Sequence, residues 1–301
     1  MEAIRKLDQM FDVLKNNPKK RLVAAYANDS HTIEAVNEAI SLGIVEGTLV
    51  GDKSVIKSVC EQENIDIGRF KIVHEPNGQA AAAKAVELIN LGEGDVLMKG
   101  LVSTDQYMRA ILNKENGLMD PNAILSHVTV MENPNYHKLM IVADVAIIPD
   151  PDLKQKIAML NYLVQTARKL GIDTPKVAVI AATEQMNPKM QSCVDAAILT
   201  QMAARGQIKN CIVDGPMAVD LAVDMESVQI KGIKSPVAGD ADCMLFHNIE
   251  AGNVFYKVNT KLAQSELGAI VVGARKPAVL SSRGDSVKTK LYSIALAAMV
   301  S

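Results

Sequence analysis

The chain has 301 residues, of which 49% are hydrophobic, and it carries a formal net charge of −2. This length is enough for one large domain or two smaller ones with packed cores. The nearly balanced charge excludes a general basic field for nucleic acid or an anionic membrane. Trp is absent and aromatic residues make up only 3% of the chain, so a base-stacking platform is also excluded.

The N-terminal residues predict a surface helix rather than a secretion signal. Ile4, Leu7, Phe11 and Leu14 fall at helical spacing, with charged residues between them. The chain contains no apolar run of the ~18 residues that a membrane span needs. The four cysteines lie far apart without metal-ligand spacing, so we expect reduced thiols, no bound metal and a cytoplasmic protein.

Short, continuous apolar runs alternate with helical patterns along the whole chain. The runs that predict strands are LVAAY (22–26), TLVGD (48–52), FKIVH (70–74), DVLMKG (95–100), HVTVM (127–131), KLMIVADVAII (138–148), KVAVIAA (176–182), CIVDG (211–215), CMLFH (243–247), AIVVG (269–273) and PAVLSS (277–282). Strands that are apolar on both faces are typical of parallel sheets covered by helices. The alternation therefore predicts a doubly wound α/β fold.

The helical patterns have recognisable start and stop signals. One helix is expected to begin after Ser30, and a second spans 152–170 and stops at Gly171. A third is expected to begin at Asn187, followed by Pro188 in its first turn.

The stretch 117–137 interrupts this alternation and marks a domain boundary. HVTVM and KLMIV, joined by ENPNYH, predict an antiparallel hairpin. We expect residues 1–122 plus 271–301 to form one α/β domain and 123–270 to form an inserted second one. A cleft between two such domains is the default ligand site.

The C-terminal segment, PAVLSSRGDSVKTK, combines a strand end, a tight turn and a helix start. Unpaired backbone N–H groups and the positive end of the helix dipole meet at such a corner. Arg283 adds a planar donor fork that suits phosphate. We therefore interpret the corner as an anion site. The alternative is that Asp285 or Ser286 only caps the helix and Arg283 is a surface charge.

A second corner of the same kind occurs in DVLMKGLVSTDQYMR. Lys99 and Gly100 end a strand, Thr104 opens a helix, and Arg109 lies about a turn further on. The carboxyl ends of strands are where open α/β sheets present residues to ligands. The alternative is a capped helix with solvated Lys and Arg side chains.

The segment SPVAGDADCMLFHNIEAGN supplies further candidates. Gly252 and Asn253 allow close backbone approach to a ligand. His247, at a strand end, is either a proton acceptor or a structural histidine. Asp214 and Asp220 lack a third acidic partner at metal spacing, which supports the expectation of no metal.

Taken together, these segments resemble the phosphate acetyl/butyryltransferase family, most closely its butyryl branch. The matching stretches lie in order over most of residues 95–301. They are MKGLVSTDQYMRAIL, VADVAIIPDPDLKQK, NPKMQSCVDAAILTQMAARGQIKNCIVDGP, SPVAGDAD, IEAGNVFYK and LSSRGDS. The resemblance implies two three-layer α/β/α domains like those of isocitrate and isopropylmalate dehydrogenases, a site in the interdomain cleft and a homodimer. It also implies the reaction of an acyl-CoA with phosphate, with coenzyme A as substrate and no tightly bound cofactor or metal.

The same resemblance implies roles for individual residues. Ser282 and Arg283 match a Ser-Arg pair associated with the tetrahedral intermediate and the phosphoryl group, and Arg109 matches an arginine associated with anion binding. In the acetyl branch a catalytic Asp follows the Ser-Arg arginine by six residues, where this chain has Thr289. Asp285 lies four residues before Thr289 and is expected on the same helix face as its substitute. Where the butyryl branch commonly has Pro-Asp, this chain has His247-Asn248.

Three other functions compete with an acyl-CoA:phosphate acyltransferase. An acyl-carrier-protein phosphate acyltransferase would need a basic docking surface, and no strong basic cluster is present in the sequence. A dehydrogenase of related fold would need an acidic metal trio and a nicotinamide site, and the GxGxxG and Walker A patterns are absent. A protein that binds CoA or acyl phosphate without turnover stays open because of Thr289. The acyl chain is not fixed by the sequence, although the branch resemblance favours butyryl.

Overall fold

The computed structural model describes residues 2–280 and 285–301. It divides into two compact units. Unit 1 contains the described residues up to Leu7 together with Ser126–Leu267, and unit 2 contains Asp8–Leu125 and Gly268–Ser301.

Residues 2–7 do not form the amphipathic helix expected from the sequence. They lie in unit 1, where the backbone N–H of Ile4 donates to the Leu170 carbonyl oxygen at 2.9 Å. Ile4 and Leu7 are buried in this position. The helix α1 therefore begins only at Gln9 and ends at Lys15.

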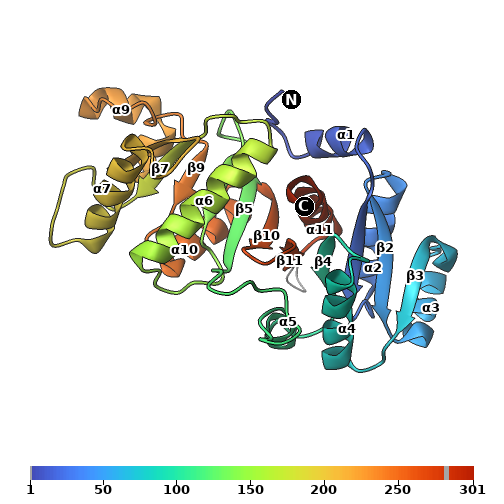
Figure 1. Cartoon of the computed structure of the whole chain (residues 1–301). Helices are drawn as coiled ribbons and strands as arrows, with labels where there is room; N and C mark the ends of the chain where they lie inside the picture. The colour runs from blue at the N-terminus through green and yellow to red at the C-terminus, as the bar shows by residue number, and fades with distance from the viewer. Residues whose placement is uncertain (1, 281–284) are drawn as a thin grey trace. The chain divides into compact units, whose positions relative to one another are not determined.

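Unit 2 contains a mixed sheet in the order β3-β2-β1-β4-β11-β10 (Figure 1). Its strands are β1 (Lys20–Ala25), β2 (Val45–Gly51), β3 (Phe70–His74), β4 (Val96–Lys99), β10 (Glu266–Val272) and β11 (Ala278–Val279). Its helices are α1, α2 (Ser30–Ser41), α3 (Lys53–Gln62), α4 (Gly78–Asn90), α5 (Thr104–Ile111) and α11 (Val287–Val300), with a 3-10 turn at Ile67–Arg69. All neighbouring strands run parallel except β10 and β11.

Unit 1 contains the strand order β5-β6-β9-β7-β8. Its strands are β5 (Ser126–Glu132), β6 (Met140–Ala143), β7 (Lys176–Ile180), β8 (Ile212–Met217) and β9 (Cys243–Leu245). Its helices are α6 (Leu153–Lys169), α7 (Gln191–Ala204), α8 (Val219–Val223), α9 (Met225–Lys231) and α10 (Ile249–Lys261). β5 and β6 form the antiparallel hairpin expected from the sequence, and the other pairs are parallel.

The burial of the central strands explains why continuous apolar runs in the sequence predicted the strands of both units. All four residues of β4 and of β6 are buried, because each strand lies inside its sheet and is covered on both faces. Each of the eleven predicted runs overlaps a strand, so the α/β class is confirmed. The helix expected from Asn187 is different: α7 starts at Gln191, and the Asn187 side chain accepts a hydrogen bond from Lys189 N in a local turn.

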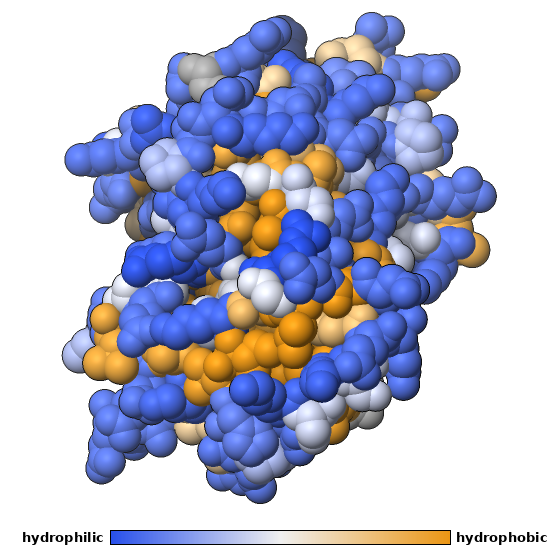
Figure 2. Space-filling view, turned by 90° about the vertical axis from the view of Figure 1, so that its right-hand side faces the viewer, coloured by the Kyte–Doolittle hydropathy of each residue, from blue (hydrophilic) through white to orange (hydrophobic). Residues whose placement is uncertain are grey.

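The edge strand β3 is protected by charge. Lys71 is exposed and forms an ion pair with Glu93 at 2.6 Å. Ile72 and Val73 are half-buried, and Val55 of α3 is exposed. Figure 2 views the molecule from the side that carries β3 and α3, where apolar areas lie among hydrophilic side chains. Charged residues on an edge strand discourage pairing with another chain. Among the described helices, none combines the length and the apolar content of a membrane span.

Candidate active site

The two corners singled out in the sequence lie on adjacent strands of unit 2. β4 and β11 are parallel neighbours, with Leu97 opposite Ala278 and Met98 opposite Val279. Both strands therefore end at the same edge of the sheet. Lys99 is the last residue of β4, and the chain that leaves β11 toward α11 starts beside it. Ser282 and Arg283 belong to that connection and lie outside the described residues.

The β4 corner places a cation at this edge. Lys99 is only 3% exposed, and its ammonium group donates to the Gly100 carbonyl oxygen at 3.2 Å. Burying an ammonium group is costly without oxygen partners or an anion. Lys99 therefore places a buried side-chain amine at the carboxyl edge of unit 2.

Gly100 has a packing role that the sequence did not reveal. A Cβ atom at this position would lie 2.5 Å from the Tyr26 carbonyl oxygen and 2.9 Å from that of Ala25. The Gly100 N–H donates to the Ala25 oxygen at 2.9 Å. The glycine thus lets the turn after β4 lie against the end of β1. Tyr26 itself has a φ of 58°, a conformation that costs energy in a non-glycine residue.

Helix α5 presents its N-terminus to the same edge. The Ser103 hydroxyl caps the helix by accepting from Gln106 N at 3.2 Å, and Thr104, its first residue, is exposed. Arg109 lies in the last turn, about 7.5 Å further along the axis. Its side chain is 77% exposed and pairs with Asp105 at 3.0 Å. The arginine is therefore at the surface, with a long side chain that is not fixed by burial.

The start of α11 differs from the expectation for Asp285. Ser286 is the N-cap, with extended backbone angles, and its hydroxyl accepts from Thr289 N at 3.1 Å. Asp285 precedes this cap, so it belongs to the connection and does not share a helix face with Thr289. The helix is thus capped by Ser286, which was one of the two capping residues considered from the sequence. Asp285 lies next to this cap and is half-buried. Lys290 in the next turn is only 3% exposed, and sequence reasoning missed it.

Gly252 and Asn253, predicted to contact a ligand, both contact the loop after β6. A Cβ atom at Gly252 would lie 2.2 Å from the Asp144 carbonyl oxygen. The Asn253 amide donates to the Val145 carbonyl oxygen at 3.0 Å. The Asp144 carboxylate in turn accepts from the backbone N–H groups of Ala146 and Ile147, both at 2.8 Å. Through these contacts Gly252 and Asn253 fix α10 against this loop.

A polar cluster forms at the carboxyl edge of unit 1. His247 follows β9, Lys156 lies in α6 and Asp195 in α7. The Lys156 ammonium group is 2.6 Å from Asp195 Oδ2 and 3.1 Å from His247 Nδ1. Burial lowers the pKa of His247, and the nearby Lys156 ammonium lowers it further.

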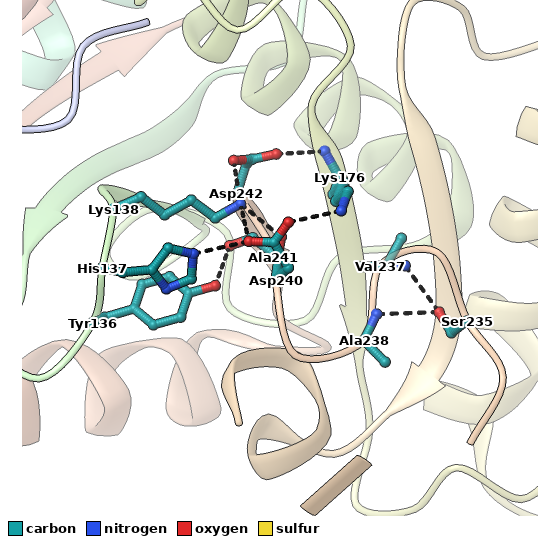
Figure 3. Close-up of polar contacts among 10 residues, drawn as sticks. All are labelled: Tyr136, His137, Lys138, Lys176, Ser235, Val237, Ala238, Asp240, Ala241 and Asp242. Carbon is teal, nitrogen blue, oxygen red and sulfur yellow. Dashed lines mark hydrogen bonds and ion pairs between the residues drawn. The ribbon is translucent and has the colours of Figure 1, made fainter. Parts of the chain in front are cut away.

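The SPVAGDAD motif lies at the opposite edge of unit 1's sheet (Figure 3). Lys138, Lys176 and Asp242 stand at the amino ends of the parallel strands β6, β7 and β9. The Lys138 ammonium is 2.8 Å from a carboxylate oxygen of Asp240 and 2.8 Å from one of Asp242. Lys176 also pairs with Asp240, at 2.7 Å.

This arrangement makes the motif a structural clamp. The Ser235 hydroxyl accepts from two backbone N–H groups and fixes the turn before Asp240 (Figure 3). Asp242 Oδ2 accepts from the backbone N–H of Lys176 at 2.8 Å. Although burial acts in the opposite direction, the hydrogen bonds from Lys138, Lys176 and His137 hold the pKa of Asp240 well below its usual range. Ligand sites of parallel sheets lie at the carboxyl ends of strands, and this cluster lies at the amino ends.

A metal ion needs several oxygen, nitrogen or sulfur ligands that converge on one point. Within residues 2–280 and 285–301, no group of three or more His, Cys, Asp or Glu side chains is arranged to hold a metal. The carboxyl edges carry Lys99, Lys156 and His247 together with the N-termini of α5 and α11, beside the carboxylates of Asp144, Asp195 and Asp285. The ammonium groups and the helix N-termini among them are donors that suit an anionic ligand.

The sequence is similar to proteins of known activity along nearly its whole length. Residues 73–298 match the model of the phosphate acetyl/butaryl transferase family. The chain is 46% identical to the phosphate butyryltransferase of Clostridium acetobutylicum over 99% of this chain and 98% of that protein. It is 41% identical to the phosphate acetyltransferase of Thermotoga maritima, over 97% of this chain and 99% of that one.

A solved structure extends the comparison to the fold. The branched-chain phosphotransacylase of Enterococcus faecalis V583 superposes with a TM-score of 0.81 at 31% identity, covering 93% of this chain and 99% of that one. The family model matches far more than half of the sequence, and the curated relatives match nearly all of it. This chain therefore belongs to the phosphate acetyl/butaryl transferase family.

Proposed function

We propose that this protein transfers an acyl group between coenzyme A and inorganic phosphate, with butyryl or a related short chain as the acyl group, in the cytoplasm. The observation that carries the proposal is the parallel pairing of β4 with β11. It brings the Lys99 corner and the end of β11 to one edge of one sheet, and Ser282 and Arg283 follow β11 in the sequence. The similarity to phosphate butyryltransferases and acetyltransferases along the whole chain supports the same chemistry.

The phosphoryl group of the acyl phosphate is the anion that this edge suits. Lys99 contributes a buried ammonium group, and the N-termini of α5 and α11 contribute positive dipole ends. Arg283 follows β11 in sequence and supplies a fork of donors. Arg109 supplies a second guanidinium when its side chain exchanges Asp105 for the phosphoryl oxygens.

The chemical step is a direct displacement. The sulfur of coenzyme A bonds to the acyl carbonyl carbon, and the bond between that carbon and the phosphate oxygen breaks with its electron pair leaving on phosphate. The thiol proton passes to Asp285, which stands directly before the cap of α11. A free thiol has a pKa near 8.5, so the base needs to supply only modest assistance. Ser282 donates to the developing oxyanion, a contribution of about 10²–10³ in rate.

Two substitutions test these roles in a steady-state assay of acyl phosphate and CoA. Arg283→Ala is expected to lower kcat/KM for acyl phosphate by at least about a hundredfold, since it removes a charge-assisted contact to the phosphoryl group. Asp285→Asn is expected to lower kcat with little change in KM and to move the rate maximum to higher pH. Arg69→Ala is the matched control, because this arginine contacts Asn37 and Ser41 on α2. Wild-type kinetics in Arg283→Ala would refute the proposed site.

The proposal includes a homodimer, and α10 supplies a surface for it. Val254, Val258 and Leu262 recur every four residues and are 62%, 45% and 78% exposed. Such an apolar stripe is typical of a surface that meets a partner. Light scattering coupled to gel filtration is expected to give twice the chain mass for the wild type and a shift toward the monomer for Val258→Lys. A monomeric wild type at micromolar concentration would contradict the dimer.

A further inference from the structure

Three side chains from three elements meet at the carboxyl edge of unit 1's sheet. Lys156 lies in the first turns of α6, Asp195 lies in α7, and His247 follows β9. Lys156 and Asp195 are 3% and 5% exposed, whereas His247 is half-buried. The capping box of Asp152 and Gln155 fixes the start of α6, so Lys156 enters the cluster from a rigid helix.

The hydrogen bonds of the cluster determine which nitrogen of His247 carries the proton. An ammonium group only donates hydrogen bonds. The Lys156 ammonium is 3.1 Å from His247 Nδ1, so this nitrogen accepts and its lone pair is engaged. The ring proton therefore stands on Nε2. Asp195 accepts from Lys156 at 2.6 Å and from the Gln191 amide at 2.8 Å, which fixes the lysine in turn.

The charges around the ring favour its neutral form. Lys156 faces it from α6, Asp195 from α7 and Asp150 from the segment before α6. Desolvation is the largest influence that lowers the pKa of His247, and Lys156 adds to it, while Asp150 and Asp195 act in the opposite direction. A proton on Nδ1 would point at an ammonium group 3.1 Å away. The ring is thus held as a neutral Nε2–H donor by geometry as well as by burial.

The position of His247 suits a contact with substrate. It stands at the carboxyl end of a parallel strand, where α/β sheets present residues to ligands. The next residue, Asn248, uses its side-chain oxygen to cap α10 at 3.0 Å from Ala251 N. The N-cap of α10 is thus formed by Asn248, and the His247 ring is not needed for it. The ring can therefore donate a hydrogen bond to a ligand at this strand end.

We infer that His247 is a neutral hydrogen-bond donor, through Nε2–H, to a carbonyl oxygen of the acyl-CoA, and that Lys156 is the positioning residue that fixes its tautomer. This inference rests on the proposed acyltransfer. It also removes His247 from the candidates for the base, because the lone pair that would take the thiol proton is engaged by Lys156. The carbonyl belongs either to the thioester or to the pantetheine amides, and kinetics separates the two.

The tautomer is tested by NMR on the full-length protein labelled at histidine. The signals of His247 are assigned by their loss in His247→Gln. We expect the Nε2–H tautomer and a titration midpoint below the ordinary value of about 6.5. In Lys156→Gln we expect the midpoint to rise. A wild-type proton on Nδ1 would overturn the tautomer, and a midpoint at or above about 6.5 would overturn the neutral form.

The contact with substrate is tested by kinetics on folded variants. His247→Leu is expected to lower kcat/KM about 10- to 100-fold, and His247→Gln, which keeps an N–H donor, to stay within about fivefold of wild type. A loss in kcat indicates the thioester carbonyl, and a rise in KM for CoA substrates indicates a pantetheine amide. His137→Leu, an exposed histidine at the other edge of the sheet, is the control. Unchanged kcat/KM in His247→Leu would overturn the contact. A wild type without acyltransfer would overturn the proposed function and the contact, while the NMR result would still decide the tautomer.

Discussion

Lys138 gives the sharpest prediction about what the SPVAGDAD motif does. Its ammonium group lies 2.8 Å from both Asp240 and Asp242, and the side chains of Lys138 and Asp242 are only 5% and 7% exposed. In Lys138→Met, Asp242 loses the ammonium group with which it pairs, although its Oδ2 keeps the hydrogen bond from the backbone N–H of Lys176. Asp240 keeps its ion pair with Lys176 and is 34% exposed.

The expected loss of stability in Lys138→Met depends on how deeply each of the two carboxylates is buried. Removing one partner of a buried ion pair costs about 3–5 kcal/mol, because the other charge is left without compensation. Since only Asp242 is deeply buried, we expect the lower end of that range, about 3 kcal/mol. At about 2–4 °C per kcal/mol for a domain of this size, the unfolding midpoint should fall by about 6–12 °C. Urea unfolding followed by circular dichroism, together with calorimetry, measures both quantities.

Lys231→Met is the matched control in the same unit. Lys231 pairs with Asp220 at 2.9 Å, but the two side chains are 37% and 47% exposed. A pair of this kind is worth up to about 1 kcal/mol. The double variant Lys138→Met/Asp242→Asn should recover part of the loss, since it removes the stranded charge. If Lys138→Met lowers the free energy of unfolding no more than Lys231→Met does, the ion pairs of Lys138 do not stabilise the motif as proposed.

Three other consequences follow from individual contacts. The hydrogen bond from Arg21 lowers the pKa of Asp95 well below its usual range. Its stabilising contribution is therefore complete above the unfolded pKa of about 3.9, declines as the pH falls below that value and is lost only as the pH passes through the folded-state pKa, so the difference between the urea midpoints of wild type and Asp95→Asn should shrink as the pH is lowered from about 5 to about 2. Gly252→Ala should destabilise the protein by about 1–3 kcal/mol in urea titrations, because the new Cβ would lie 2.2 Å from the Asp144 oxygen; an unchanged midpoint would show that α10 moves freely. Ser286→Ala should cost about 0.5–2 kcal/mol through loss of the cap at Thr289 N, measured by the same titration, and a cost below about 0.3 kcal/mol would contradict the capping role.

The strands were predictable because their signal is local. A buried run such as VLMK in β4 has no polar face, and short runs of this kind separated by helical patterns specify a parallel sheet. The hairpin of β5 and β6 was predictable from its turn residues. The structure of residues 2–7 was not predictable, because their apolar spacing fits a helix equally well. Burial by the chain around Leu170, a contact distant in sequence, decides their structure.

The sequence predicted which strand-to-helix turns form the candidate site, but it predicted few of the side-chain contacts. Lys99 was found because it ends a strand and precedes a glycine. Gly252 was interpreted as an approach to ligand, since a sequence does not show that the Asp144 backbone occupies the space. The cluster of Lys156, Asp195 and His247 was missed because its members are separated by 39 and 91 residues from the lysine. Only the fold brings α6, α7 and the end of β9 together.

The central claim is that the protein catalyses phosphate-dependent acyl transfer from CoA. The most direct measurement incubates the purified protein with acetyl-, propionyl-, butyryl- or isobutyryl-CoA and phosphate, and follows free thiol and acyl phosphate in the same samples. We predict equal amounts of thiol and acyl phosphate, formed only when phosphate is present, with a short-chain substrate preferred. Thiol release that does not depend on phosphate, or no release with any of the four substrates, would contradict the account.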